Sequence, residues 1–317
     1  MALGIDLHCD LLSYLAAWPE HTPYDEGSVV NLHLHEQGGV GTLILPFFAP
    51  TKPGSEEAFE PQMRIFKNLS SKIKLVPAIE NASCFIGEEE PLEKGIQRLK
   101  SLGQKFLYLT VTWNGENRFG GGVGSEKGLT DEGKILLDAI PPFFTAIDFS
   151  HTSDRLARDI LKYLDQTKSP LKVMASHSNF RAVQDVPRNL PEDIAQEIVR
   201  RDGIIGLNLI RNFVGPRSTS FFDHIEYALK KGWGGHLALG ADFFDIDFEH
   251  APNYDMPKEI QDLPLSERHA RFLEEHFFPE YPNASSLQTL AREVSHRFGQ
   301  AVGEGFWWKN ASSKLFI

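Results

Sequence analysis

Five side chains of the types that bind metal ions each come shortly after an apolar segment of the sequence: His8, Asp10, Glu80, His151 and His177. Imidazole and carboxylate ligands without thiolates suit zinc or another borderline divalent ion. A carboxylate such as Glu80 can bridge two ions, leaving His8 and Asp10 for one and His151 and His177 for the other. A water shared by two such ions becomes hydroxide near neutral pH. These residues therefore indicate a binuclear metal-dependent hydrolase, with zinc as the expected ion.

Each of these residues also has a simpler structural interpretation. Asp10 could cap a helix that begins at LLSYLAAW, because Asp is a favoured N-cap residue. His151 and His177 both follow a serine and could be hydrogen-bonded histidines at the edge of the core. His33 and His35 have the His-Xaa-His spacing of many metal sites, but they lie in a predicted helix before the second strand. We therefore expect that pair near the non-catalytic face.

Eight short apolar runs alternate with helical segments, which predicts a parallel β-sheet. The runs cover residues 3–7, 41–47, 75–79, 106–111, 145–149, 171–175, 204–208 and 236–240. Eight repeats favour a (β/α)8 TIM barrel, with a doubly wound open sheet as the alternative. In such barrels the catalytic groups follow the C-terminal ends of the strands. The five candidate ligands meet that condition, and so does Asp242 after the eighth run.

The end of the sequence predicts an addition to the barrel rather than a second domain. A loop rich in proline and acidic residues follows the eighth strand, and helices are expected around 265–277 and 284–303. We expect these C-terminal helices to cover part of the barrel. No linker-like Pro/Gly/Ser tract divides the chain, so residues 1–317 are predicted to form a single hydrolase domain.

Composition excludes several classes of protein. A formal net charge of −11, with no long basic run, argues against nucleic acid as a partner. No stretch approaches the length of a membrane span and no secretory signal is visible, so we expect no membrane partner and a cytoplasmic protein. Two cysteines, Cys9 and Cys84, are too few for a disulfide scaffold.

The sequence resembles the membrane (renal) dipeptidase family of the amidohydrolase superfamily along nearly its whole length. The landmarks are IDLHCD (5–10), NLHLHEQGGVG (31–41), PAIENA (77–82), YLTVTWN (108–114), GLTDEGKILL (128–137), IDFSHTS (147–153), ASHSNFRAV (175–183), RNLPEDI (188–194) and LGADF (239–243). The resemblance implies zinc-dependent cleavage of dipeptides, a Glu80 bridge between two zinc ions, and a possible homodimer. It also implies that Arg188 binds the free carboxylate of the substrate. Asp242 would carry the proton from the attacking water to the leaving amine.

The sequence departs from the family pattern at two places. After the fourth strand it has Thr112-Trp113 where the family commonly has Thr-His, so the histidine that stabilises the transition-state oxygen is replaced by Trp113. Asn114, Asn117 and Arg118 are candidates to replace the lost donor, and we expect Trp113 and Asn114 to contact the substrate. The family's Asp-Phe-Asp-Gly at the last strand is replaced by residues 242–245, Asp-Phe-Phe-Asp.

These departures leave two alternatives to a dipeptidase. One is an amidohydrolase whose substrate is an acylated amino acid or a lactone. The other is a metal-binding protein with weakened catalysis. The retained Asp242 favours catalysis.

Overall fold

The eight strands close into one parallel barrel in which strands adjacent in sequence are adjacent in space and β8 pairs with β1. The computed structural model describes residues 2–247 and 263–316. The strands are β1 (Gly4–Asp6), β2 (Val40–Phe48), β3 (Lys74–Glu80), β4 (Phe106–Thr110), β5 (Phe144–Asp148), β6 (Lys172–Ala175), β7 (Ile204–Leu207) and β8 (Leu237–Leu239). Each overlaps a predicted apolar run. The (β/α)8 barrel is confirmed, and the open-sheet alternative is wrong.

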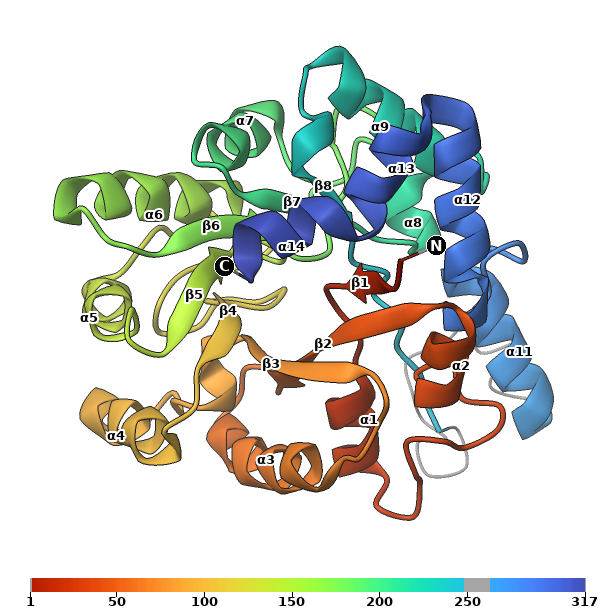
Figure 1. Ribbon diagram of the computed structural model, residues 1–317. Helices are drawn as coiled ribbons and strands as arrows, with labels where there is room; N and C mark the ends of the chain where they lie inside the picture. Colours follow the sequence, from red (N-terminus) through yellow and green to blue (C-terminus); the bar gives the residue numbers. More distant parts are fainter. Residues whose placement is uncertain (1, 248–262, 317) are drawn as a thin grey trace.

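Helices surround the barrel on its outer side (Figure 1). Those before β8 are α1 (Leu11–Ala17), α2 (Leu32–Gln37), α3 (Phe59–Asn68), α4 (Leu92–Leu102), α5 (Asp131–Ala139), α6 (Asp154–Thr167), α7 (Glu192–Arg200), α8 (Arg211–Val214) and α9 (Ser220–Lys230). Helix α6 shows why such segments are helical. The hydroxyl of Ser153 accepts a hydrogen bond from the Leu156 N–H and caps its first turn. Its apolar residues, at helical spacing, face the core.

The C-terminal segment continues as α11 (Leu265–His276), α12 (Leu287–Phe298), α13 (Gln300–Glu304), the π-helical turn η5 (Gly305–Lys309) and α14 (Asn310–Leu315). The helix expected over 284–303 is interrupted at Gly299, whose φ of +93° is left-handed. The loop predicted after β8 falls largely on residues 248–262, which lie outside the described residues. Among the described residues, no helix combines the length and apolarity needed to cross a bilayer.

Helix α14 lies across the barrel beside β7 and β8 (Figure 1). Its residues Ala311 and Leu315 belong to the same apolar cluster as inward-facing strand residues such as Ile5, Met174 and Ala238. The expectation that C-terminal helices cover part of the barrel is confirmed. The helices expected from the sequence end at residue 303, so α14 itself was not predicted.

Candidate metal centre

All the candidate ligands lie where their strands end at the C-terminal rim. His8 and Asp10 follow β1, Glu80 is the last residue of β3, and His151 and His177 follow β5 and β6. Parallel strands end at one rim of a barrel, so residues far apart in the sequence can converge there.

Glu80 lies between two groups of ligand atoms. Its Oε2 is 3.5 Å from Nε2 of His8, and Asp10 Oδ1 is 3.6 Å from the same nitrogen. Its Oε1 is 3.0 Å from Nε2 of His151 and 3.7 Å from Nε2 of His177. His8, Asp10 and Glu80 can therefore converge on one ion, and Glu80, His151 and His177 on another. These two groups correspond to the division expected from the sequence, which stays a prediction. His8, His177 and Asp242 form a third group of adjacent ligand atoms.

Each of the three histidines uses its Nδ1 for a hydrogen bond within the protein, which leaves Nε2 facing Glu80. The pairs are His8 with the Tyr108 hydroxyl at 2.8 Å, His151 with Asn114 Oδ1 at 2.7 Å, and His177 with Ser176 Oγ at 2.6 Å. A partner on one ring nitrogen sets the tautomer and directs the other nitrogen to a metal.

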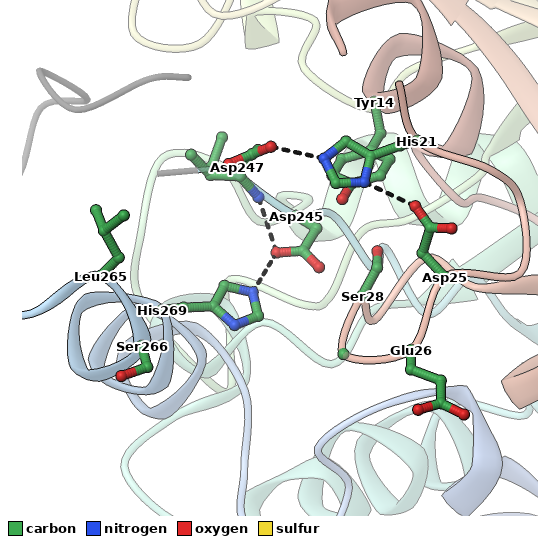
Figure 2. Close-up of a pocket in the computed structure, with 12 residues that line it drawn as sticks. Tyr14, His21, Asp25, Glu26, Ser28, Asp245, Asp247, Leu265, Ser266 and His269 are labelled. Atoms are coloured by element: carbon green, nitrogen blue, oxygen red, sulfur yellow. Dashed lines mark hydrogen bonds and ion pairs between the residues drawn. The ribbon is translucent and has the colours of Figure 1, made fainter. Parts of the chain in front are cut away.

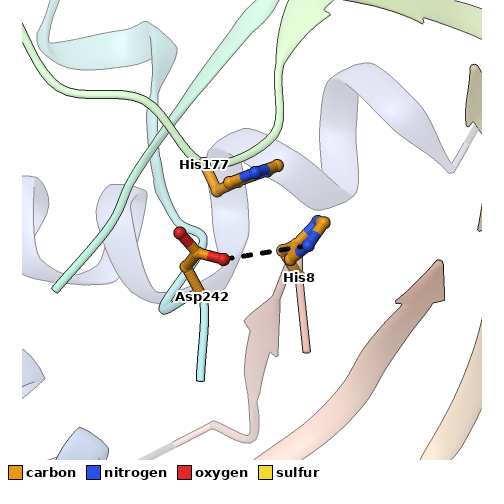
Figure 3. Close-up of side chains that lie close together, drawn as sticks. All are labelled: His8, His177 and Asp242. Carbon is orange, nitrogen blue, oxygen red and sulfur yellow. Dashed lines mark ion pairs between the residues drawn. The ribbon is translucent and has the colours of Figure 1, made fainter. Parts of the chain in front are cut away.

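Asp242 approaches the centre from the end of β8. Its Oδ1 lies 3.8 Å from His8 Nε2, and the ring of His177 lies 3.7 Å from the ring of His8, centroid to centroid (Figure 3). The Asp242 N–H donates to the His8 carbonyl at 3.2 Å. Asp242 therefore sits beside the first group of ligands, within the site.

Burial and charge shift the ionisation of these groups. Burial alone would raise the pKa of Glu80, but the facing His8 and His151 imidazoles hold it well below its usual range. Burial, reinforced by the Asp10 and Glu80 carboxylates, outweighs the attraction of His8 and raises the pKa of Asp242 well above its ordinary value. Burial, with His8 nearby, lowers the pKa of His177. Burial would lower the pKa of His8, but its interactions with Tyr108, Glu80 and Asp10 raise this pKa well above the ordinary value. The site therefore concentrates carboxylates and imidazoles away from water.

The residues present fit divalent cations. His8 Nε2 and Asp10 Oδ1 are buried without a hydrogen-bond partner, and both atoms are electron-pair donors that face the same point. Unpaired buried polar groups are costly, and metal coordination is an ordinary way to satisfy them. Asp10 occupies the N-cap position of α1, but its side chain makes no capping hydrogen bond there, so helix capping does not account for this carboxylate.

Three residues at the rim adopt left-handed backbone conformations. The φ angles are 71° at Asn81, 63° at His151 and 65° at Asp242. Such conformations cost energy in residues with a side chain and concentrate at functional sites. Here they occur at, or directly beside, residues that point into the centre.

The three predicted substrate contacts surround this centre. Arg188 is buried, donates to Ser178 Oγ at 2.8 Å and to the His177 carbonyl at 3.1 Å, and has an Nε without a partner. The ring of Trp113 lies 5.9 Å from that of His151 and stands edge-on to Phe48 at 5.2 Å. Asn114 is exposed, with its side-chain oxygen on His151.

The histidines at 33 and 35 do not join the ligands. His33 is exposed, whereas His35 is fully buried with its Nε2 3.8 Å from Asp6 Oδ2. The expected location near the non-catalytic face is therefore wrong for His35, because Asp6 ends β1 just before His8. Burial lowers the pKa of His35 to about 4, so this imidazole is neutral.

Sequence reasoning missed the polar residues behind the ligands, Tyr108, Asp148 and Ser176. Tyr108 lies inside the barrel, and its hydroxyl donates to the Leu7 carbonyl at 3.2 Å while contacting His8. The period-two alternation of β4 could have placed the Tyr108 ring in the barrel interior. It could not have identified His8 as its partner.

A second group of titratable residues lines a separate 290 Å³ pocket (Figure 2). His21 lies between Asp25 Oδ2, at 2.7 Å, and Asp247 Oδ2, at 2.6 Å. His269 Nε2 lies 2.7 Å from Asp245 Oδ1. None of the five candidate ligands lines this pocket. We interpret these contacts as ion pairs that tie the segment after β8 to neighbouring elements.

A closed parallel barrel with a buried histidine and carboxylate centre at its C-terminal rim defines a metallohydrolase of the amidohydrolase type. Residues 62–263 match the model of the family described as membrane dipeptidase (peptidase family M19). The chain belongs to this membrane dipeptidase family, as its sequence motifs predicted.

Two individual proteins are similar to parts of this chain. The chain is 30% identical over 208 residues to an uncharacterized protein in the pqqA 5′ region of Klebsiella pneumoniae, covering 60% of this chain and 69% of that one. It is 28% identical over 166 residues to an uncharacterized dipeptidase of Schizosaccharomyces pombe, covering 49% of this chain but only 38% of that longer protein.

A solved structure shares the fold of this chain. It is a metallo peptidase from Rhodobacter sphaeroides, liganded with a phosphinate mimic of the dipeptide L-Ala-D-Ala. The identity is 17%, the coverage is 99% of both chains, and the TM-score is 0.76.

Proposed function

We propose that the protein is a binuclear zinc dipeptidase whose ligands are His8, Asp10, Glu80, His151 and His177. One observation carries the proposal: the two oxygens of Glu80 face two different groups of imidazole nitrogens, at 3.5 Å on one side and 3.0 Å and 3.7 Å on the other. A carboxylate in this position is suited to bridging two ions. Two bound divalent ions would supply Lewis acidity to activate water and polarise the scissile carbonyl.

Asp242 is suited to carry the proton. Its carboxylate lies beside the ligands, and its pKa is raised, so it can accept a proton from the attacking water and hold it until the amine leaves. The protein therefore needs no histidine general base in this scheme.

Arg188 is suited to bind the free carboxylate of the substrate. It is buried beside His177, and its Nε has no partner among the described atoms. Attraction to Asp242 and Glu80 partly offsets the effect of burial, which lowers the pKa of Arg188. A substrate carboxylate would complete the hydrogen bonding of a desolvated guanidinium.

Trp113 favours a second candidate function. It occupies the rim next to His151, at the position where the family commonly has a histidine that binds the substrate. An indole there narrows the space and supplies a single N–H donor. This observation keeps an acylated amino acid or a lactone as an alternative substrate class.

The test is a hydrolysis screen with the metal content measured in parallel. Purified protein, supplied with zinc, is assayed on dipeptides with L- and D-residues at the C-terminal position, on N-acyl amino acids and on lactones. We expect about two divalent ions per chain and release of free amino acids from dipeptides. Protein that binds no divalent ion would remove the proposal. Two ions with activity confined to lactones or N-acyl amino acids would select the alternative.

We also propose that residues 1–317 act as one barrel domain and that the protein forms a homodimer, as the family resemblance implies. Light scattering coupled to size-exclusion chromatography would measure its mass in solution.

A further inference from the structure

Asp148 is a fully buried carboxylate at the end of β5 that the proposed reaction does not use. Its Oδ1 accepts hydrogen bonds from the Ser150 N–H at 3.1 Å and the Ser176 N–H at 2.7 Å. Its Oδ2 accepts from the Thr110 hydroxyl at 2.9 Å and the Ser176 hydroxyl at 2.5 Å. Four donors from three strand ends thus converge on one carboxylate.

The hydroxyl of Ser176 connects this carboxylate to a ligand. A serine hydroxyl has one hydrogen to donate, and an ionised carboxylate can only accept. Because Ser176 Oγ donates to Asp148, it must accept from His177 Nδ1, which lies 2.6 Å away. His177 then carries its proton on Nδ1, and its Nε2 presents a lone pair toward His151 Nε2, 3.0 Å away, and Glu80 Oε1, 3.7 Å away.

The backbone of Ser176 has little room to shift. A Cβ on Gly206 would lie 2.0 Å from the Ser176 carbonyl oxygen, and a Cβ on Gly240 would lie 1.9 Å from it. Only glycine at these two positions permits β7 and the end of β8 to approach the Ser176 backbone so closely. The Ser150 hydroxyl also accepts from the His177 N–H at 3.1 Å. The two serines of the repeated Ser-His pattern therefore both act on His177.

We propose that Asp148 is a positioning residue that acts through Ser176 to fix the tautomer and orientation of His177 and to increase electron density at its Nε2. Asp148 touches neither substrate nor metal. Its effect is confined to the ion held by Glu80, His151 and His177. This inference rests on the proposed metal centre. Residues that orient a metal-binding histidine in this way typically change metal affinity by about 10- to 100-fold.

Two substitutions separate this role from simple structural support. Ser176→Ala removes the hydroxyl that links Asp148 to His177 but keeps the backbone N–H bond to Asp148. Thr110→Val removes a different donor to the same carboxylate oxygen, with little change in volume, and leaves the link intact. Both side chains are fully buried, so the pair is matched for burial.

The experiment titrates metal-stripped proteins with Zn²⁺ in competition with a chromophoric chelator, and with Co²⁺ followed by visible absorption. We expect two ions for the unmodified protein and for Thr110→Val. For Ser176→Ala we expect one site of normal affinity and one weakened by about 10- to 100-fold. Urea midpoints measured on the same samples establish that each variant is folded.

Three results would count against specific claims. Two sites of normal affinity in Ser176→Ala would overturn the inference while leaving the proposed metal centre intact. Equal weakening in Thr110→Val and Ser176→Ala would show that Asp148 only supports the strand ends, which also overturns it. No binding by the unmodified protein would instead reject the metal centre. Asp148→Asn should weaken the same site, and if it fails to fold, the serine and threonine variants still decide.

Discussion

The side-chain oxygen of Asn114 lies 2.7 Å from Nδ1 of His151, so it accepts the proton of that ring nitrogen and leaves Nε2 to face Glu80. Asn114 is one of three residues, with Asn117 and Arg118, that the sequence offers as candidates to replace the donor lost at Trp113. Its oxygen instead supports a ligand, and only its amide nitrogen is left to donate to a substrate. Asn114 therefore compensates only partly for the hydrogen-bond donor that is lost at Trp113.

Replacing Trp113 with the family residue should improve ordinary dipeptide hydrolysis. A preorganised donor to the developing oxyanion is typically worth about 2.7 to 4 kcal/mol, so Trp113→His is expected to raise kcat by about 100- to 1,000-fold if this contribution is fully recovered. Steady-state kinetics on a dipeptide panel measure this. Trp113→Phe is the control, because it reduces bulk without adding a donor. No gain on dipeptides, together with loss of another hydrolytic activity, would assign Trp113 to a different substrate pocket.

Replacing Glu80, the proposed bridging carboxylate, should remove metal ions from the centre. Glu80→Gln replaces a charged ligand with a neutral amide, and we expect metal content to fall well below that of the unmodified protein. Elemental analysis measures the ions per chain. His33→Ala is the matched control, since His33 is exposed and should change nothing. His35→Ala is unsuitable, because it would leave a cavity beside Asp6. Equal losses in Glu80→Gln and His33→Ala would show that the ligands are assigned wrongly.

Substitutions of Arg188 and Asp242 should affect two different steps, substrate binding and the chemical step. Arg188→Met removes a charge-assisted contact to the substrate carboxylate and should chiefly raise KM. Asp242→Asn removes the proton carrier and should chiefly lower kcat with the metal content unchanged. Kinetics and elemental analysis on the same preparations test both. An Arg188→Met variant with normal KM on every substrate would reject the proposed carboxylate contact.

The ion pairs of His21 should contribute a pH-dependent part of stability. Burial would lower the pKa of His21, but its hydrogen bonds to Asp247 and Asp25 outweigh that effect and raise it. A raised histidine pKa stabilises the fold below the ordinary value of about 6.5, and this stabilisation is lost as the pH rises through the folded pKa.

His21→Asn should therefore lower the free energy of unfolding more at pH 6 than at pH 9, with a difference of about 0.5 to 1.5 kcal/mol. Urea unfolding of both proteins at the two pH values measures this difference. The exposed His33→Asn serves as the comparison for a general effect of losing an imidazole. The same loss for His21→Asn at both pH values would show that His21 is not held in its charged form.

The strands and the candidate ligands could be predicted because both depend on local sequence. A buried parallel strand appears as a short continuous apolar run, and the residue after it lies at the catalytic rim. Glu80 and His177 were identified in this way. The relation between them, with Glu80 facing both ligand pairs, was implied by the family resemblance and by ligand chemistry rather than by spacing.

Partners that depend on strand register could not be predicted. Tyr108 meets His8 across the interior of the closed barrel. Asp148 meets Ser176 because β5 and β6 pair in a register that places Asp148 opposite Met174, two residues before Ser176. His35 meets Asp6 because α2, which packs beside β2, places this imidazole next to the end of β1. A sequence read segment by segment contains no information about such alignment.

The position of α14 has a consequence for the order in which the molecule is made. β8 ends at Leu239, whereas Ala311 and Leu315, which fill the barrel interior, are translated much later. At ribosomal rates of about 5 to 20 residues per second, the strands emerge seconds before the segment that covers them. During that interval interior side chains such as Ile5 and Met174 lack the apolar contacts that α14 provides in the folded protein. The apolar cluster of the barrel interior is therefore completed only after nearly the whole chain has been synthesised.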